Sequence, residues 1–125
     1  MFAKRGEIYW VQFDPVKGSV QGGLRPALVV QQDIGNRYSP TAVVVALATT
    51  LPPRLFPFVV VVEPAESGLS QASAIRCAQV ATIQKEEPGS RLRPSRGESA
   101  VRPIGHLSPR KMLEVDAALR YNLGL

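Results

Sequence analysis

TAVVVALATT, residues 41–50, is the stretch that decides the predicted fold of this chain. Its β-branched residues are nearly uninterrupted, which is typical of a strand buried on both faces. The following sequence LPPRLFP, residues 51–57, ends the strand because adjacent prolines cannot donate the hydrogen bonds of a sheet. The apolar run FVVVV at 58–62 predicts a second strand beyond this interruption.

Three more strands are predicted on either side of this pair. Residues 8–13 and residues 73–83 alternate with the period of two that half-buried strands show, and residues 26–32 form an apolar run. The stretch 16–25 is punctuated by glycines and lacks periodicity, so it is expected to be a mobile loop between the first two strands.

The C-terminal segment predicts a helix. Ser108 and Pro109 match an N-cap and a first helical position, apolar residues then recur at helical spacing from Met112 to Leu123, and Gly124 follows. Short strands with one terminal helix predict a mainly β protein, a small and strongly bent β-barrel with the helix over its open end.

Length and composition are those of a single domain spanning residues 1–125. A chain of this size with 45% hydrophobic residues can close a core without disulfides or a metal. The single cysteine, Cys77, lies in an alternating strand pattern and is expected to be a core thiol. With neither a signal-peptide pattern nor a stretch of membrane-spanning length, a cytoplasmic protein without membrane contact is expected.

The charge balance favours polyanionic partners. Fifteen Lys and Arg against ten Asp and Glu give a net charge of +5, a modest indication of nucleic-acid binding. The arginine-rich and proline-rich segment 88–103 is expected to be a long exposed loop. Its arginines are candidates for RNA contact, and a solvated insertion without a binding role is an equally supported interpretation.

The chain has few of the side chains on which most enzymes depend. Its only histidine, His106, has no nearby acid or nucleophile in the sequence, and no His, Cys or carboxylate cluster has metal-ligand spacing. We therefore expect neither a metal site nor a cofactor, and we expect His106 to be structural.

The residues before the second predicted strand suit a phosphate ligand. Gly22 and Gly23 permit close approach of the backbone, the guanidinium of Arg25 can bind two oxygens at once, and Pro26 fixes the adjacent backbone. Taken alone, the short pattern GG-x-RP favours the simpler interpretation, a turn followed by an arginine at a strand edge.

Five stretches together resemble the MazF/PemK family of toxin endoribonucleases along almost the whole chain. They are RGEIYWVQFDP, KGSVQGGLRPALVVQQD, NRYSPTAVVVAL, QVATI and IGHLSPRKMLEVDAALRYNLGL. The resemblance implies an SH3-like barrel, a cytoplasmic homodimer and sequence-specific, metal-independent cleavage of single-stranded RNA. It also implies neutralisation by a MazE-like antitoxin.

The resemblance also implies the site residues. The arginine of GG-x-RP is Arg25, and the family's catalytic threonine, at the end of the third strand, is assigned to Thr49 with Thr50 as substitute. In an ungapped comparison with some relatives this position falls on Ala48, which would imply lost activity. The residues expected to contact RNA are Lys17, Ser19, Gln21, Gly22, Gly23, Thr50 and Gln79. Tyr9 and Trp10, being mid-strand, are expected in the core or a dimer contact rather than as stacking surfaces for bases.

The implied reaction is attack of the RNA 2′-hydroxyl on its own phosphorus, which yields a 2′,3′-cyclic phosphate and a 5′-hydroxyl. Arg25 would stabilise the transition state, and Thr49 would hydrogen-bond a phosphate oxygen or orient the nucleophile. Two other interpretations remain: a gyrase-binding toxin of the CcdB type, disfavoured because the chain ends without a tryptophan, and a non-catalytic RNA-binding barrel, favoured if Ala48 occupies the threonine position.

Overall fold

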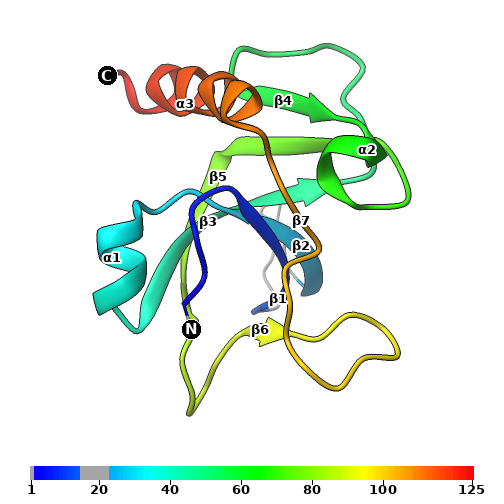
Figure 1. Cartoon of the computed structure of the whole chain (residues 1–125). Coiled ribbons are helices and arrows are strands. Elements are labelled where there is room, and N and C mark those ends of the chain that lie inside the picture. Colours follow the sequence, from blue (N-terminus) through cyan, green and yellow to red (C-terminus); the bar gives the residue numbers. More distant parts are fainter. Residues whose placement is uncertain (1, 15–22) are drawn as a thin grey trace.

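The computed structural model describes residues 2–14 and 23–125 of the chain (Figure 1). In chain order its elements are β1 (Glu7–Phe13), β2 (Gly23–Val29), α1 (Asp33–Tyr38), β3 (Thr41–Ala48), β4 (Val59–Val62), α2 (Pro64–Ser67), β5 (Ser73–Gln84), β6 (Leu92–Arg93), β7 (Gly105–His106) and α3 (Pro109–Leu123). Among these residues no helix is long and apolar enough to cross a lipid bilayer.

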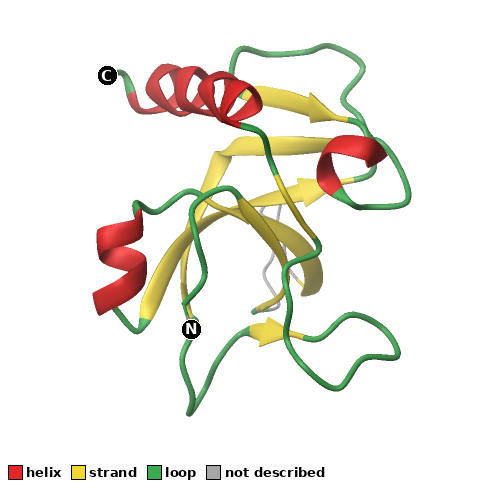
Figure 2. Cartoon of the chain, viewed as in Figure 1, coloured by secondary structure: helices red, strands yellow, loops and turns green. Residues whose placement is uncertain are grey.

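The strands form one antiparallel sheet in the order β4-β5-β3-β2-β1-β6, with β7 paired to β1 beside this path. Figure 2 shows the sheet curling into a half-barrel, and α3 packs on β4 and β5. The register of β3 against β5 shifts between Val45 and Leu47, an irregularity of the kind that bends a sheet. The predicted class, mainly β with a C-terminal helix, is confirmed.

Strand alternation divides the core between the two faces of the sheet. One cluster lies toward α3 and includes Ile8, Leu28, Val45, Leu47, Ile75, Cys77, Leu107 and Val115. The other lies on the opposite face and includes Tyr9, Val11, Ala27, Val29, Val44, Ala46 and Ile83. The prediction that β3 is buried on both faces is therefore confirmed for Val44–Ala48. Cys77 is the expected core thiol, and burial raises its pKa to about 11.

The segment after β2 differs from the prediction. The strand expected at 26–32 begins at Gly23 and ends at Val29, and helix α1, which was not among the expected elements, begins at Asp33. The reason is a local network: Gln31 Nε2 donates to Asn36 Oδ1 at 3.0 Å, and Asn36 Nδ2 donates to the Gln31 carbonyl at 2.8 Å. Asn36 is completely buried, so these bonds satisfy its amide and hold helix α1 where the chain leaves the sheet.

The segment 88–103, expected to be an exposed loop, contains a short strand. Leu92 pairs with Val11 and packs against the second core cluster, so the chain is held to β1 at this point. Beyond it, residues 96–103 are exposed, as expected.

Gly68, the C-cap of α2, is expected to be a sensitive position. Its φ is +82°, and a Cβ there would collide with the carbonyl oxygen of Ile104. Gly97 has nearly the same φ, +84°, with nothing within 4 Å of such a Cβ. Gly97→Ala should therefore lose only the left-handed backbone cost, about 1 kcal/mol, whereas Gly68→Ala should lose about 1–3 kcal/mol more. Urea unfolding of both variants checks the difference, and equal losses would contradict the collision.

Asp33 makes stability depend on pH. The backbone N–H of Arg5 donates to Asp33 Oδ1 at 2.8 Å, and Asn36 Nδ2 donates to the same atom at 3.1 Å. These bonds, the first above all, lower the pKa of Asp33 from its ordinary value of 3.8. Because the folded pKa is depressed, the contribution is complete above the ordinary value and is lost as pH falls through the folded pKa.

We expect the free energy of unfolding of the wild type to exceed that of Asp33→Asn at pH 7, and the gap to narrow at pH 3. Urea titrations of both proteins at the two pH values measure it. A gap that is independent of pH would show that the carboxylate charge does not matter.

Candidate active site

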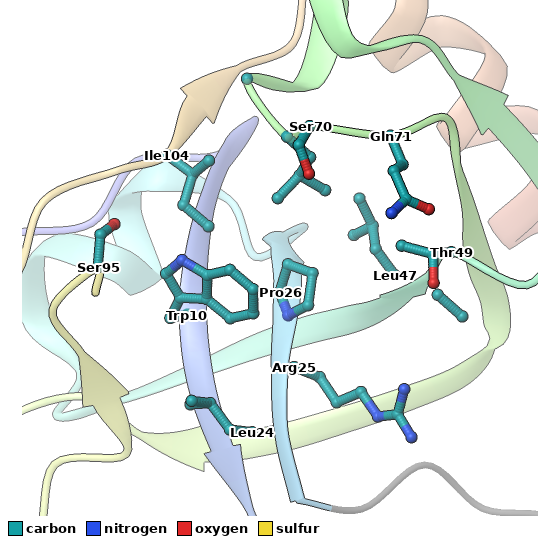
Figure 3. Close-up of a pocket in the computed structure, with 13 residues that line it drawn as sticks. Trp10, Leu24, Arg25, Pro26, Leu47, Thr49, Ser70, Gln71, Ser95 and Ile104 are labelled. Atoms are coloured by element: carbon teal, nitrogen blue, oxygen red, sulfur yellow. The ribbon is translucent and has the colours of Figure 1, made fainter.

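A cleft of about 390 Å³ opens where β2 begins and β3 ends, bordered by β1, by the residues after α2 and by the segment before β7 (Figure 3). Arg25 is the only charged side chain among the described residues that line it. Its side chain is exposed, and its backbone pairs with Val11 of β1. The strand thus fixes the Cα of Arg25 while its guanidinium stays accessible.

The end of β3 brings a hydroxyl to the same cleft. Ala48, the last residue of β3, is 7% exposed, and the next residue, Thr49, is exposed and lines the cleft. In Figure 3 Arg25 and Thr49 lie on the same side of Pro26. An arginine and a threonine hydroxyl together can stabilise and orient an anionic group such as a phosphate.

Ala48 also lies close to Arg25 in the sheet. The register of β2 against β3 pairs Ala27 with Ala46, and continuing it by two residues would set Arg25 across from Ala48. The residue facing Arg25 along this register therefore offers a methyl group, whereas Thr49 reaches the cleft from just beyond the strand.

Residues 4–123 match the model of a protein family described as the PemK-like, MazF-like toxin of type II toxin-antitoxin systems. The chain belongs to this family. It is 38% identical to endoribonuclease EndoA of Bacillus subtilis (strain 168), over all of this chain and 97% of that one. The present chain is therefore an endoribonuclease.

Solved structures share the fold of this MazF-like toxin. MazF (Form-I) from Deinococcus radiodurans superposes with a TM-score of 0.73 at 22% identity, covering 100% of this chain and 99% of that one. A mycobacterial endoribonuclease in complex with its cognate antitoxin superposes with a TM-score of 0.72 at 24% identity, covering 98% and 96%.

The structure of this MazF-like toxin brings together only some of the predicted site residues. Arg25 and Thr49 line one cleft, whereas Thr50, the residue after Thr49, and Gln79 on β5 are not among its lining residues. Gly23 begins β2 with a φ of +76°, a conformation that favours glycine. The predicted RNA contacts Lys17, Ser19, Gln21 and Gly22 lie outside the described residues.

The toxin's two mid-strand aromatic residues have different roles. Tyr9 is in the core as expected, and its hydroxyl donates to Glu7 Oε1 at 3.0 Å. Trp10 is not in the core, because it is half-buried and lines the Arg25 cleft, and the alternative expectation of a dimer contact stays a prediction. The alternation of β1 already separates the two, since successive side chains point to opposite faces.

Three polar residues of the cleft were missed by sequence reasoning. Ser70 and Gln71 follow α2, and Ser95 follows β6. Nothing in the sequence around Ser70 indicated that Ser70 and Gln71 would line one cleft with Pro26 of β2.

The arginines of segment 88–103 divide into two kinds. Arg91 donates to Asp14 Oδ1 at 2.6 Å, and Arg93 donates to the carbonyls of Ser90 and Leu92, so both stabilise the fold. Arg96 and Arg102 have no hydrogen-bond or ion-pair partner within residues 2–14 and 23–125. All four arginines stay candidates for RNA contact, and Arg96 and Arg102 would break no such bond to make one.

Within the described part of the chain, no three His, Cys, Asp or Glu residues are grouped so that they could hold a metal ion. His106 lies on β7, outside the cleft lining, with its Nδ1 2.9 Å from the carbonyl oxygen of Leu107.

Proposed function

We propose that this MazF-like endoribonuclease cleaves single-stranded RNA at the Arg25 cleft, sequence-specifically and without a metal or the ribosome. The 2′-hydroxyl of the RNA attacks the adjacent phosphorus, and the products are a 2′,3′-cyclic phosphate and a 5′-hydroxyl. The observation that carries the proposal is that Arg25 and Thr49, distant in sequence, line one cleft.

The charge of each side chain determines the role that we assign to it in the reaction. In the transition state negative charge grows on the nonbridging phosphate oxygens, and a fixed guanidinium stabilises it with two parallel hydrogen bonds. The hydroxyl of Thr49 donates to a phosphate oxygen or orients the attacking 2′-oxygen. Arg25 does not serve as the base, because a guanidinium keeps its proton at physiological pH. The described lining holds no histidine or carboxylate, so the proton acceptor is not assigned to it.

Exposed apolar surface supports the proposed assembly, a cytoplasmic homodimer neutralised by a MazE-like antitoxin. Large apolar side chains are exposed around β4 and α3, among them Leu55, Phe56, Leu113 and Tyr121. Phe56 stacks on Phe58 at 5.3 Å between ring centroids. Exposed apolar surface of this kind marks protein interfaces. A solved mycobacterial relative is described as bound to its cognate antitoxin.

A second candidate is an RNA-binding barrel that does not cleave. The observation that favours it is Ala48, which stands across from Arg25 in the continued register and supplies no hydroxyl. One experiment separates the two candidates.

Purified protein should be incubated with a long unstructured RNA in EDTA, and the ends of the products mapped. Cleavage at a recurring short sequence, with cyclic-phosphate ends, supports the nuclease. Binding in a filter assay without cleavage supports the second candidate. Folded protein that neither binds nor cleaves RNA would contradict both candidates.

A further inference from the structure

We propose that the Trp10 side of the Arg25 cleft is a subsite for one nucleobase of the RNA, next to the phosphate that Arg25 holds. This inference rests on the proposed function and extends it from the phosphate to the base. It starts from the shape of the cleft, which has two chemically different sides.

Figure 3 shows Pro26 between these two sides, with Arg25 and Thr49 on one and Trp10, Ser95 and Ile104 on the other. The first side supplies a cation and a hydroxyl, which suit a phosphate. The second supplies an indole ring with apolar neighbours and no charge. A phosphate gains nothing from such a surface, whereas a flat base with an apolar face does.

The position of Trp10 is fixed by the sheet. It lies on β1, paired with Pro26 of β2 on one side and Arg93 of β6 on the other. A side chain held on a central strand loses little conformational freedom when a ligand binds, which favours its use as a rigid stacking surface.

Among the described residues, the polar groups on the Trp10 side of the cleft have unused hydrogen-bonding capacity. Within residues 2–14 and 23–125, the indole Nε1–H has no acceptor, although the ring is half-buried and such a donor usually finds one. The side chain of Ser95, which lies on the same side of Pro26 as Trp10, likewise makes no hydrogen bond among these residues. These neutral donors and acceptors match the edge of a nucleobase, which also presents neutral donors and acceptors.

Single-stranded RNA is read by this combination of contacts. Its unstacked bases stack on aromatic side chains and bond through their edges. Stacking is lost when the aromatic residue is removed, with an effect of roughly 5-fold to 150-fold per base. Arg25 and Trp10 are on adjacent β-strands. A phosphate and a neighbouring base of one RNA molecule can therefore occupy the two sides of the cleft together.

Trp10 is the only tryptophan of the chain, so its fluorescence reports on this subsite directly. The protein should be titrated with fully 2′-O-methylated oligonucleotides, which lack the nucleophile: oligo-U, oligo-C, oligo-A, any mapped cleavage sequence and an abasic oligomer of equal length. Anisotropy of a label on each oligomer follows binding independently. We expect at least one base-containing oligomer to change the emission and the abasic one to leave it unchanged. Unchanged emission with every oligomer, or an equal change with the abasic one, would overturn the subsite.

Cleavage kinetics give a second test that a merely structural role of Trp10 would not pass. Abasic nucleotides are placed one at a time on each side of the mapped cut. In the wild type, one such position should lower kcat/KM by roughly 5-fold to 150-fold, and in Trp10→Leu the same position should have little further effect. Trp10→Phe should keep part of the dependence, and Tyr38→Leu, which removes an exposed aromatic ring on α1, should keep all of it.

The outcomes separate the subsite from the function on which it rests. If the wild type cleaves RNA and Trp10→Leu lowers kcat/KM equally for the intact and all abasic substrates, the subsite is overturned. The proposed nuclease activity then still holds. Absence of cleavage by the wild type overturns the nuclease, and the fluorescence titration then decides whether the cleft binds a base.

Discussion

Arg25→Ala should lower the rate of RNA cleavage by about a hundredfold to a thousandfold, the usual cost of removing one preorganised donor to a developing negative charge. The effect is expected to be this large because no other charged side chain among the described lining residues could take its place. Arg25→Lys should recover only part of the activity, since an ammonium is a point charge and cannot bind two oxygens in parallel. Single-turnover cleavage of an end-labelled RNA measures all three proteins.

A matched control is Arg110→Ala. Arg110 is an exposed arginine in the first turn of α3, where a positive charge opposes the helix dipole, so its loss should not destabilise the protein. It removes the same net charge as Arg25→Ala and should leave cleavage within about twofold of the wild type, because long-range electrostatic attraction to RNA changes little. Equal losses in both variants would mean that Arg25 contributes only to general attraction, and the proposed role would be wrong.

The strands could be predicted from sequence because each has a pattern that survives tertiary packing. The β-branched run of β3 and the alternation of β1 and β5 follow from which faces are buried, and Ser108, Pro109 and Gly124 bound helix α3 as expected. The short elements could not be predicted in the same way. Helix α1 depends on the buried amide of Asn36, whose partners are known only once the chain is folded.

Only part of the candidate site could be predicted, because the other part depends on contacts that form when the chain folds. Arg25 and Thr49 were identified through resemblance to a family, and their pattern in the sequence alone favoured a simple turn. Trp10, Ser70 and Ser95 belong to the same cleft through strand pairing and through the contact of Gly68 with Ile104. Such contacts between segments that are distant in the sequence leave no periodic signal, so sequence reasoning placed Trp10 in the core or a dimer contact and Ser95 in an exposed loop.

Thr49→Ala should lower cleavage by about a hundredfold if its hydroxyl donates to the transition state, and Thr49→Ser, which keeps the hydroxyl, should remain close to the wild type. Because Thr49 is exposed and lies beyond the end of β3, neither change should alter folding, and equal urea midpoints would confirm this. Thr82→Ala is the matched control, since Thr82 is an exposed threonine on β5 outside the cleft lining.

The alternative position, Ala48, makes the experiment decisive. If Thr49→Ala cleaves RNA as fast as the wild type, the hydroxyl of Thr49 is not used, and Ala48→Thr then tests the residue across from Arg25. A faster rate in Ala48→Thr would show that the chain carries a methyl group where a hydroxyl serves catalysis better. A slower rate is expected if Thr49 is the donor, because Ala48 is 7% exposed and a polar group placed there must be desolvated beside a working site. Ala48→Thr thus changes the rate in opposite directions under the two assignments, and Thr49→Ala lowers it under only one of them. Only one of these adjacent side chains can point at the phosphate that Arg25 holds.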